Sequence, residues 1–300
     1  MTAYKAALLG QELSHSISHI LHNMLFPILA SKYNLTNASL EYELVERTDA
    51  NEFASWINAA SRDGHIGVNV TYPYKNNAYH ISDRHIGNAA SITSANVIRF
   101  QNRVIECAST DGQGFLNALL RAQPHLVLGN YHLVIVGAGA VAKAIAYTLC
   151  TWTMPLSLTI VNRSIKAAQE LAEFCVAESP GPSVRAMHIN DFINFYPEPK
   201  KRLVIQATPV GQKNHPGNIA AGFIWDESDI AVDVVYNPER TPFLSNAEQS
   251  GAKTVGGLGM LIEQAALSQA FWLTGLCPTT SPLSNEEFEN IHDLLHGSLS

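Results

Sequence analysis

The chain has 300 residues, of which 46% are hydrophobic and 15% are charged, and its formal net charge is −7. This length and composition suit two globular domains, each with a hydrophobic core of its own. An acidic chain without a basic stripe is a poor match for nucleic acid or for an anionic membrane surface. Composition therefore argues against both of these partners.

The sequence is expected to lack a signal peptide and a transmembrane helix. The N-terminal segment Met1–Gly10 has no long hydrophobic region and no cleavage site, so no signal peptide is expected. The longest apolar stretch, Leu133–Val161, contains glycines, a proline and Lys143, which argues against a transmembrane helix. The scattered cysteines form no CxxC pair and are expected to be reduced thiols in the cytoplasm: Cys107, Cys150, Cys175 and Cys277.

The first third of the chain alternates predicted strands and helices, which indicates an α/β layer structure. Short apolar runs predict buried strands at Tyr4–Leu9, Leu40–Leu44 and Ile66–Val70. Helices are predicted at Ser18–Lys32 and Glu52–Ala60. A pair of adjacent strands is predicted at Ser94–Phe100 and Arg103–Ala108.

The remainder of the chain predicts a parallel sheet. Asp111 fits the N-cap of a helix whose apolar face begins at Phe115. Short apolar runs at parallel-strand spacing follow, with helical segments between several of them: His132–Val136, Leu158–Val161, Leu203–Gln206 and Ile230–Val234. The glycine-rich segment Val255–Gly259 could be a hinge, and Leu261–Gly275 is a strongly predicted helix.

A glycine motif lies between the first of these parallel strands and the helix after it. Its sequence is Gly137-Ala138-Gly139-Ala140-Val141-Ala142, which is G-x-G-x-x-A. Gly137 allows a tight turn, Gly139 leaves room for a pyrophosphate, and Ala142 permits close helix–strand packing. The helix N-terminus then offers unpaired N–H groups to phosphate. In this context the motif predicts a dinucleotide site, and the alternative is a tight turn that binds nothing.

The residues after the next strand favour NADP over NAD. An NAD enzyme usually places Asp or Glu there for the ribose hydroxyls, but this chain has Asn162-Arg163-Ser164. Arg163 can pair with a 2′-phosphate, Ser164 can donate a further hydrogen bond, and Lys166 adds positive charge nearby. The alternative for Arg163 is a solvated surface arginine. We also count Thr208 and Val234 among the residues expected to bind the cofactor.

Several loop-like polar segments outside the glycine motif carry residues suited to chemistry. The segments before residue 113 are Ser14–Ser18, Gly67–Lys75, Ser94–Asn96 and Ser109–Gly112. In order and spacing they resemble the shikimate dehydrogenase family, above all through Asn69-Val70-Thr71-x-Pro73-x-Lys75 and Thr110-Asp111-Gly112. Later matches are Asp233-x-x-Tyr236-x-Pro238, Thr241-Pro242-x-Leu244 and Gly257-Leu258-Gly259-Met260-Leu261-x-x-Gln264-Ala265. The resemblance runs essentially from end to end.

The resemblance implies a role for each matching residue. In the family, the two serines that match Ser16 and Ser18 bind the substrate carboxylate. The residues that match Lys75 and Asp111 form the catalytic pair beside the hydroxyl that is oxidised. The match to Gly257 lies against the nicotinamide. The positions that bind the substrate's hydroxyls and carboxylate match Thr71, Asn96, Tyr236 and Gln264.

The resemblance also implies an α/β fold of two domains with a cleft between them. Residues 1–110 correspond to the substrate-binding catalytic domain, and residues 111–256 to a Rossmann-like nucleotide-binding domain. Residues 257–300 correspond to C-terminal helices that return to the first domain. The family uses no metal. His15, His19 and His22 could gather on one helical face as metal ligands, but no HExxH motif or nearby acid supports this.

The leading hypothesis is NADP-dependent, reversible reduction of 3-dehydroshikimate to shikimate, in chorismate and aromatic amino acid biosynthesis. The alternatives are a family member that prefers quinate or uses NAD, and a non-catalytic binding protein on the same scaffold. The related fold of folate or amino-acid dehydrogenases fits less well. We expect a monomer or a homodimer. The chain departs from the family pattern at His19, Val97, Ser109, Ala140, Gln206 and Gln212, and none of these changes removes a proposed catalytic group.

Overall fold

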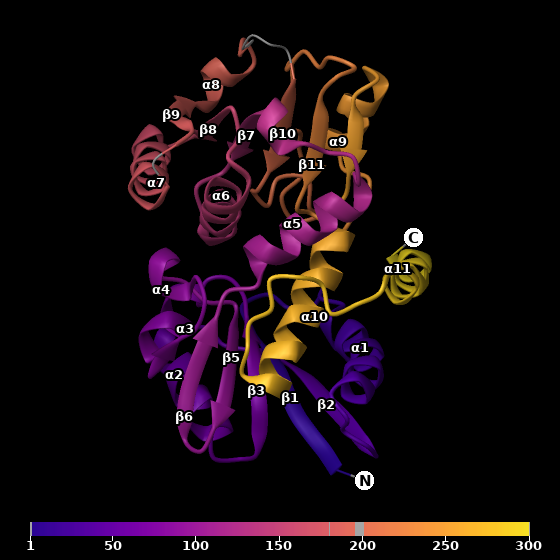
Figure 1. Cartoon of the computed structure of the whole chain (residues 1–300). Helices are drawn as coiled ribbons and strands as arrows, with labels where there is room; N and C mark the ends of the chain where they lie inside the picture. The colour runs from indigo at the N-terminus through magenta and orange to yellow at the C-terminus, as the bar shows by residue number, and fades with distance from the viewer. Residues whose placement is uncertain (1, 180, 196–200, 300) are drawn as a thin grey trace. The chain divides into compact units, whose positions relative to one another are not determined.

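The computed structural model describes residues 2–179, 181–195 and 201–299, and its chain divides into two units. Unit 1 consists of Met1–Gly114 and Ile262–Ser298, and unit 2 of Phe115–Leu261 together with Leu299–Ser300 (Figure 1). Each unit is an α/β layer structure with one six-stranded sheet. The predicted fold class, α/β with two domains, is therefore confirmed.

The sheet of unit 1 is mixed, with the strand order β2-β1-β3-β5-β6-β4. Its strands are β1 (Thr2–Gly10), β2 (Ala38–Glu46), β3 (His65–Val70), β4 (Arg84–His85), β5 (Val97–Gln101) and β6 (Val104–Ala108). Strand β1 pairs in parallel with both β2 and β3, whereas β5 pairs antiparallel with β3 and β6. The hairpin predicted between residues 94 and 108 is thus present as β5 and β6.

Helices cover both faces of this sheet. The helices of unit 1 are α1 (Ser18–Lys32), α2 (Ala50–Ala60), α3 (Lys75–Ile81), α4 (Ala89–Ile92), α11 (Asn285–Leu299) and parts of α5 (Asp111–Ala122) and α10 (Leu258–Thr274). Ala7 and Leu9 of β1 pack in one core with Phe53 of α2, while Ala6 of β1 packs in another core with Trp272 of α10. Alternate residues of one strand therefore face different helices. Full burial of side chains such as Phe53 is worth about 1.5–3 kcal/mol each.

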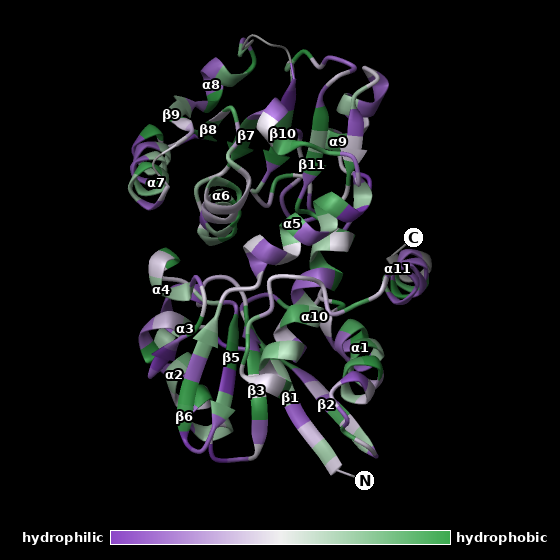
Figure 2. Cartoon of the chain, in the orientation of Figure 1, coloured by the Kyte–Doolittle hydropathy of each residue, from purple (hydrophilic) through white to green (hydrophobic). Residues whose placement is uncertain are grey.

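The sheet of unit 2 is entirely parallel, with the order β12-β11-β10-β7-β8-β9. Its strands are β7 (His132–Val136), β8 (Ser157–Asn162), β9 (Ser183–His188), β10 (Arg202–Gln206), β11 (Ile230–Asp233) and β12 (Lys253–Val255). The helices are α6 (Ala140–Thr153), α7 (Ile165–Glu178), α8 (Ile189–Phe192) and α9 (Pro242–Gln249), with a 3₁₀ turn at Leu128–Asn130. In Figure 2 the central strands β10 and β11 are largely green, as expected for strands buried on both faces, whereas β5 and β6 show both colours.

The strand order of unit 2 reverses direction between β7 and β10. From β7 the chain proceeds through β8 to β9 on one side, and from β10 through β11 to β12 on the other. In open parallel sheets of this kind, ligands bind outside the carboxyl ends of the strands at such a switch point. The glycine motif directly follows β7, so it lies at this point of the sheet.

Two broader observations apply to residues 2–179, 181–195 and 201–299. In this described part of the chain, no helix combines the length and the hydrophobicity needed to cross a bilayer. Within the same ranges, no cluster of three or more His, Cys, Asp or Glu side chains is arranged to bind a metal ion. His22, one of the three histidines considered as metal ligands, is 1% exposed and stacks on Tyr42, with 4.3 Å between ring centroids.

Candidate active site

Lys75 is the first residue of helix α3, and its neighbours fix where that helix begins. Tyr74, the preceding residue, is 3% exposed and stacks on Phe53 with 5.0 Å between ring centroids. The Tyr74 hydroxyl donates a hydrogen bond to the main-chain oxygen of Arg47 at 2.8 Å. The main-chain oxygen of Lys75 accepts a hydrogen bond from the N–H of Ala95 at 3.0 Å. The backbone at Lys75 is therefore held on both sides.

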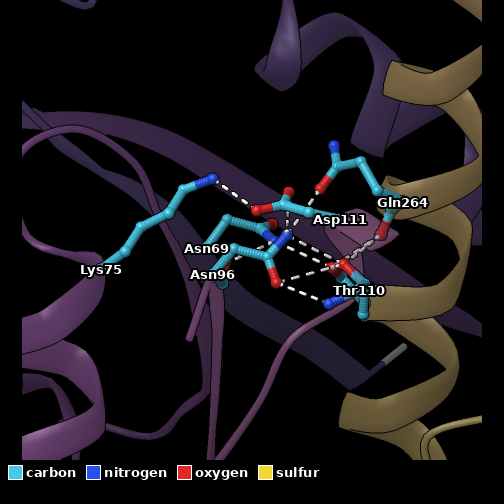
Figure 3. Close-up of polar contacts among 7 residues, drawn as sticks. Asn69, Lys75, Asn96, Thr110, Asp111 and Gln264 are labelled. Carbon is cyan, nitrogen blue, oxygen red and sulfur yellow. Dashed lines mark hydrogen bonds and ion pairs between the residues drawn. The ribbon is translucent and has the colours of Figure 1, made fainter. Parts of the chain in front are cut away.

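Asp111 is the partner of Lys75 (Figure 3). Lys75 Nζ donates to Asp111 Oδ2 at 2.6 Å, and the two side chains are only 12% and 8% exposed. The main-chain oxygen of Thr110 accepts the N–H of Gly114 at 2.8 Å, which makes Thr110 the N-cap of α5. The sequence-based assignment of the cap to Asp111 was wrong by one residue. Asp111 instead occupies the first turn, where a negative charge is favourable, and its carboxylate is directed to Lys75.

Asn96 binds the second oxygen of the Asp111 carboxylate. Asn96 Nδ2 donates to Asp111 Oδ1 at 2.8 Å and to Thr110 Oγ1 at 2.9 Å. In return, the main-chain N–H of Thr110 donates to Asn96 Oδ1 at 2.7 Å. Because a main-chain N–H can only donate, this contact fixes which end of the Asn96 amide is the oxygen. Asp111 Oδ2 thus accepts a hydrogen bond from Lys75, and Asp111 Oδ1 accepts one from Asn96.

Helix α10 adds Gln264 to the same group. Asn96 Nδ2 lies 3.2 Å from Gln264 Oε1. The start of α5 approaches α10 closely here, because a Cβ on Gly114 would lie 2.7 Å from the main-chain nitrogen of Gln264. Four of the predicted site residues are thus brought together in unit 1: Lys75, Asp111, Asn96 and Gln264 (Figure 3).

A second group of predicted site residues lies at the start of helix α1. Ser16 Oγ donates to Ser18 Oγ at 3.0 Å, and both residues are 8% exposed. Ser18 begins the 15-residue helix, whose N-cap residue Ile17 makes no side-chain capping bond and whose first turn holds no acidic residue. This helix end therefore suits an anion. Thr71 directly follows β3, and its main-chain N–H donates to the oxygen of Leu9 at 3.0 Å.

The Lys75–Asp111 pair has the chemistry of a proton donor and its orienting partner. A lysine ammonium can donate a proton to an oxygen on which negative charge develops, and it stabilises that charge before the transfer. Exclusion of water from the pair strengthens these electrostatic effects. Asp111 holds the ammonium in place, and Asn96 in turn holds Asp111. The arrangement suits acid–base chemistry at an alcohol or ketone group.

The predicted dinucleotide turn of unit 2 has the local geometry that a phosphate requires. Gly137 has a φ of +127°, and a Cβ on it would lie 2.6 Å from the main-chain oxygen of Ala207. A Cβ on Gly139, by contrast, would meet nothing within 4 Å. Gly139 is also the N-cap of the 14-residue helix α6, which has no side-chain cap and no acid in its first turn. Ala138 lies between the two glycines, and Ala140 and Val141 begin the helix.

The residues expected at a 2′-phosphate are exposed after β8. Asn162 ends the strand, and Ser164 is the N-cap of α7, where its hydroxyl accepts from the N–H of Ala167 at 3.3 Å. Arg163 is exposed. Lys166 forms a loose surface ion pair with Glu170 at 3.8 Å, with side chains 84% and 64% exposed. Both cations are therefore accessible to an anionic group.

The remaining predicted cofactor residues of unit 2 lie at the carboxyl ends of β10 and β11. A Cβ on Gly137 would lie 3.2 Å from Thr208 Cγ2, so the glycine turn and Thr208 are neighbours. A Cβ on Gly257 would lie 2.5 Å from the main-chain oxygen of Val234, which brings these two residues together. Tyr236, expected to bind substrate, is half-buried and follows β11 in unit 2.

Sequence reasoning assigned no role to Gln206, although its side chain shapes the loop that carries Thr208. Its Nε2 donates to the main-chain oxygens of Thr208 and Val210 at 3.0 and 2.7 Å, and its Oε1 accepts from the N–H of Thr208 at 2.6 Å. Gln206 is fully buried. The departure from the family pattern at this position was the available signal. Sequence reasoning named Asn69 only as part of a motif and did not consider Ser268; their hydrogen bond is described below.

Comparison with known proteins gives one family match within unit 1 and similarities that extend over most of the chain. Residues 8–98 match the family model for the shikimate dehydrogenase substrate binding domain. The chain is 32% identical to the shikimate dehydrogenase (NADP(+)) of Methanopyrus kandleri over 88% of both chains. It is 27% identical to shikimate 5-dehydrogenase of Thermus thermophilus, whose structure is in complex with NADP(H) and shikimate; the TM-score is 0.76 over 97% of this chain and 99% of that one. Quinate dehydrogenase of Corynebacterium glutamicum, in complex with NAD, has the same fold at 24% identity, with a TM-score of 0.81 over 99% of this chain and 100% of that one.

These similarities and the two α/β units define the chain as an oxidoreductase of the two-domain dehydrogenase type. More particularly, it belongs to the shikimate dehydrogenase family. The resemblance inferred from the sequence motifs is therefore confirmed.

Proposed function

We propose that this protein catalyses the reversible, NADP-dependent reduction of 3-dehydroshikimate to shikimate. The observation that carries the proposal is the largely buried Lys75–Asp111 pair, 2.6 Å apart, in a chain 32% identical to a shikimate dehydrogenase (NADP(+)). Support for both ligands comes from the Thermus thermophilus relative, which binds NADP(H) and shikimate. The matched family domain, residues 8–98, supports a substrate-binding role for unit 1.

The substrate carboxylate is proposed to bind at the start of α1. Ser16 and Ser18 place two hydroxyl groups 3.0 Å apart at a helix end whose N-cap residue, Ile17, makes no side-chain capping bond. Hydroxyl donors and a helix N-terminus together favour a carboxylate. The substrate hydroxyls would then be bound by polar side chains that the family resemblance implicates: Thr71, Asn96, Tyr236 and Gln264.

The residues of unit 2 fit an NADP cofactor. The open space above Gly139 and the uncapped start of α6 suit the pyrophosphate. The exposed cations Arg163 and Lys166 suit the 2′-phosphate, with Ser164 and Asn162 beside them. Thr208, Val234 and Gly257, at the ends of β10 and β11 and the start of α10, complete the proposed site. When bound, NADPH supplies the hydride for the reduction.

Lys75 is proposed to carry the proton of the reaction. In the direction of reduction, a new C–H bond forms at the carbonyl carbon and the C=O π electrons move to oxygen. The Lys75 ammonium stabilises this charge and gives its proton to the oxygen, which becomes the product hydroxyl. The neutral amine then takes a proton from water. Asp111 keeps Nζ oriented throughout.

The proposal is tested by measuring cofactor reduction with the purified protein, shikimate or quinate, and NADP or NAD, in all four pairings. We expect the highest kcat/KM for shikimate with NADP, at least about tenfold above the pairings with NAD, because charge-assisted hydrogen bonds to the 2′-phosphate are lost with NAD. A higher kcat/KM with quinate would assign the chain to quinate oxidation instead. Binding of shikimate and NADP without turnover in any pairing would identify a non-catalytic protein.

A further inference from the structure

A chain of buried hydrogen bonds connects the Lys75–Asp111 group to the interior of unit 1. Tyr42 OH donates to Asn69 Oδ1 at 3.0 Å, and Asn69 Nδ2 donates to Ser268 Oγ at 3.0 Å. Ser268 Oγ lies 3.2 Å from Thr110 Oγ1, which accepts from Asn96 Nδ2 at 2.9 Å. All five residues are at most 8% exposed. The chain therefore runs through the interior from Tyr42 to the amide that binds Asp111, and Figure 3 shows its part from Asn69 to Asp111.

The direction of the hydrogen bonds is set at the Tyr42 end. Burial raises the pKa of the Tyr42 hydroxyl well above its usual value, so the group keeps its proton and donates it to Asn69 Oδ1. The ring of Tyr42 is fixed by stacking on His22, whose Nδ1 and main-chain oxygen lie 3.1 and 2.8 Å from Gln269 Nε2. With its oxygen engaged, Asn69 presents its NH₂ group to Ser268.

The Ser268 hydroxyl can accept a hydrogen bond through its oxygen and donate one through its proton. Its oxygen accepts from Asn69, so its proton is directed at the main-chain oxygen of Gln264, at 2.8 Å, or at Thr110 Oγ1, at 3.2 Å. The Thr110 hydroxyl lies 3.0 Å from the same Gln264 oxygen. The Ser268 and Thr110 hydroxyls thus share the Gln264 oxygen and lie 3.2 Å apart, which places Ser268 against the side chain that receives the Asn96 amide.

Loss of the Ser268 hydroxyl would remove the nearer of the two acceptors of Asn69 Nδ2. The other acceptor near Asn69 Nδ2 is the main-chain oxygen of Asn96, at a long 3.4 Å. A buried donor without an acceptor costs about 1–3 kcal/mol, so the neighbouring groups rearrange to satisfy it. Thr110 is the nearest hydroxyl to Ser268 in this chain of contacts and would be drawn toward Asn69, away from Asn96.

From these contacts we infer that Ser268 is a positioning residue: through Thr110 and Asn96 it keeps the Asp111 carboxylate in the orientation that binds the Lys75 ammonium. The inference rests on the proposed function, because it assigns Ser268 to the same reaction. Ser268 does not touch the reacting atoms. Its effect is therefore expected on the rate of the bound complex and not on substrate affinity.

Steady-state kinetics of Ser268→Ala test the inference. We expect kcat to fall about tenfold, which corresponds to about 1.4 kcal/mol, while KM for shikimate stays within about twofold. The matched control is Thr274→Val, which removes another α10 hydroxyl that donates to the carbonyl four residues earlier, Thr274 Oγ1 to Ala270 O at 2.7 Å. The control should keep the wild-type kcat. An unchanged kcat in Ser268→Ala, or equal losses in both variants, would overturn the inference.

A double-mutant cycle with Tyr42→Phe tests whether the chain of contacts acts as one unit. Tyr42→Phe alone should lower kcat by about fivefold, because Asn69 loses the donor that fixes its amide. On the Ser268→Ala background the same change should lower kcat by less than about twofold, since the connection is already broken. Full multiplication of the two losses would mean that the residues act independently, and the inference would be wrong.

A readout that needs no turnover separates this inference from the proposed function. The side-chain NH₂ signals of Asn69 and Asn96 can be followed by ¹⁵N NMR and assigned with the Asn69→Asp and Asn96→Asp variants. In Ser268→Ala both signals should shift, whereas Thr274→Val should leave them in place. If neither signal moves, Ser268 does not position Asn96, whichever substrate the enzyme uses. If both move while the wild type oxidises neither shikimate nor quinate, the positioning stands and the proposed function falls.

Discussion

Replacing Lys75 by methionine is the most direct test of the proposed chemistry, because it removes the ammonium and keeps most of the side-chain stem. Lys75 Nζ lies 2.6 Å from Asp111 Oδ2 in a pair that is 12% and 8% exposed. Proton transfer by a positioned side chain is worth about 10²–10⁴ in rate. We expect kcat to fall about 10³-fold, or about 4 kcal/mol, with KM for shikimate changed by less than about threefold.

The Lys75→Met variant should also have a lower free energy of unfolding than the wild type. Removing one member of a buried ion pair costs about 3–5 kcal/mol, because the other charge remains buried. Asp111 keeps the hydrogen bond from Asn96 and lies in the first turn of α5, so the lower end, about 3 kcal/mol, is expected. The matched control is Lys5→Met, which breaks an exposed pair with Asp63 at 3.1 Å, with side chains 44% and 67% exposed. That change should cost less than about 1 kcal/mol and leave kcat unaltered.

Initial rates of NADP reduction and urea unfolding measure these two quantities. Lys75→Arg adds a decisive comparison, since guanidinium keeps the charge but does not give up its proton. Its kcat should remain at least about 100-fold below the wild type. A Lys75→Met enzyme with kcat within about tenfold of the wild type would refute the assignment of Lys75 as proton carrier. Recovery of the wild-type kcat by Lys75→Arg would show that charge alone suffices.

Three further predictions concern unit 2. Arg163→Ala should raise KM for NADP by about 10–100-fold and leave KM for NAD unchanged, as steady-state kinetics with both cofactors would reveal. Gly137→Ala should lower the free energy of unfolding by more than about 1 kcal/mol, because φ is +127° and the new Cβ would lie 2.6 Å from a main-chain oxygen. Gly139→Ala should unfold at the wild-type urea concentration and lose cofactor affinity only; equal stability losses in the two variants would contradict the geometry of the turn. Burial raises the pKa of the Asp233 carboxyl from 3.8 to about 6, so the folded chain holds this proton more tightly than the unfolded chain. Its stabilising contribution is full below about pH 4 and is lost as pH rises through about 6. Relative to Asp233→Asn, the wild type should therefore lose up to about 3 kcal/mol between these pH values in urea titrations, and parallel pH curves would contradict the assignment.

In unit 2, the strands that apolar runs predicted are the buried strands β7, β8, β10 and β11. Strand β7, His-Leu-Val-Ile-Val, is a continuous apolar run because helices cover both sides of the parallel sheet. Strands β9 and β12 were not predicted. Both lie at the edges of the sheet, and both contain polar residues that reach solvent, as in Ser183–His188. Their identity as strands depends on pairing with a neighbour, and local sequence does not encode that pairing.

Site residues that belong to a family motif could be predicted from the sequence. Contacts between residues far apart in the chain could not. The resemblance to a family singled out Lys75 and Asp111, and the structure places them in contact. The bond from Asn69 to Ser268, by contrast, joins positions 199 residues apart. Ser268 lies one helical turn after Gln264, which puts the two on one face of α10, but periodicity does not say which buried amide that face will meet.

The packing of Trp272 on the sheet of unit 1 affects the order in which the newly translated chain can fold. Its indole covers β3 so closely that a Cβ on Gly67 would lie 2.2 Å from the ring, and its Nε1 donates at 2.9 Å to the oxygen of Ile98, 174 positions earlier in the chain. During translation, the six strands of unit 1 therefore leave the ribosome long before the residue that covers them. The core of unit 2 lies within the continuous stretch Phe115–Leu261 and can be completed first. Unit 1 is thus synthesised first, but its core is completed last. A nascent chain stalled before α10 exposes apolar surface that chaperones recognise.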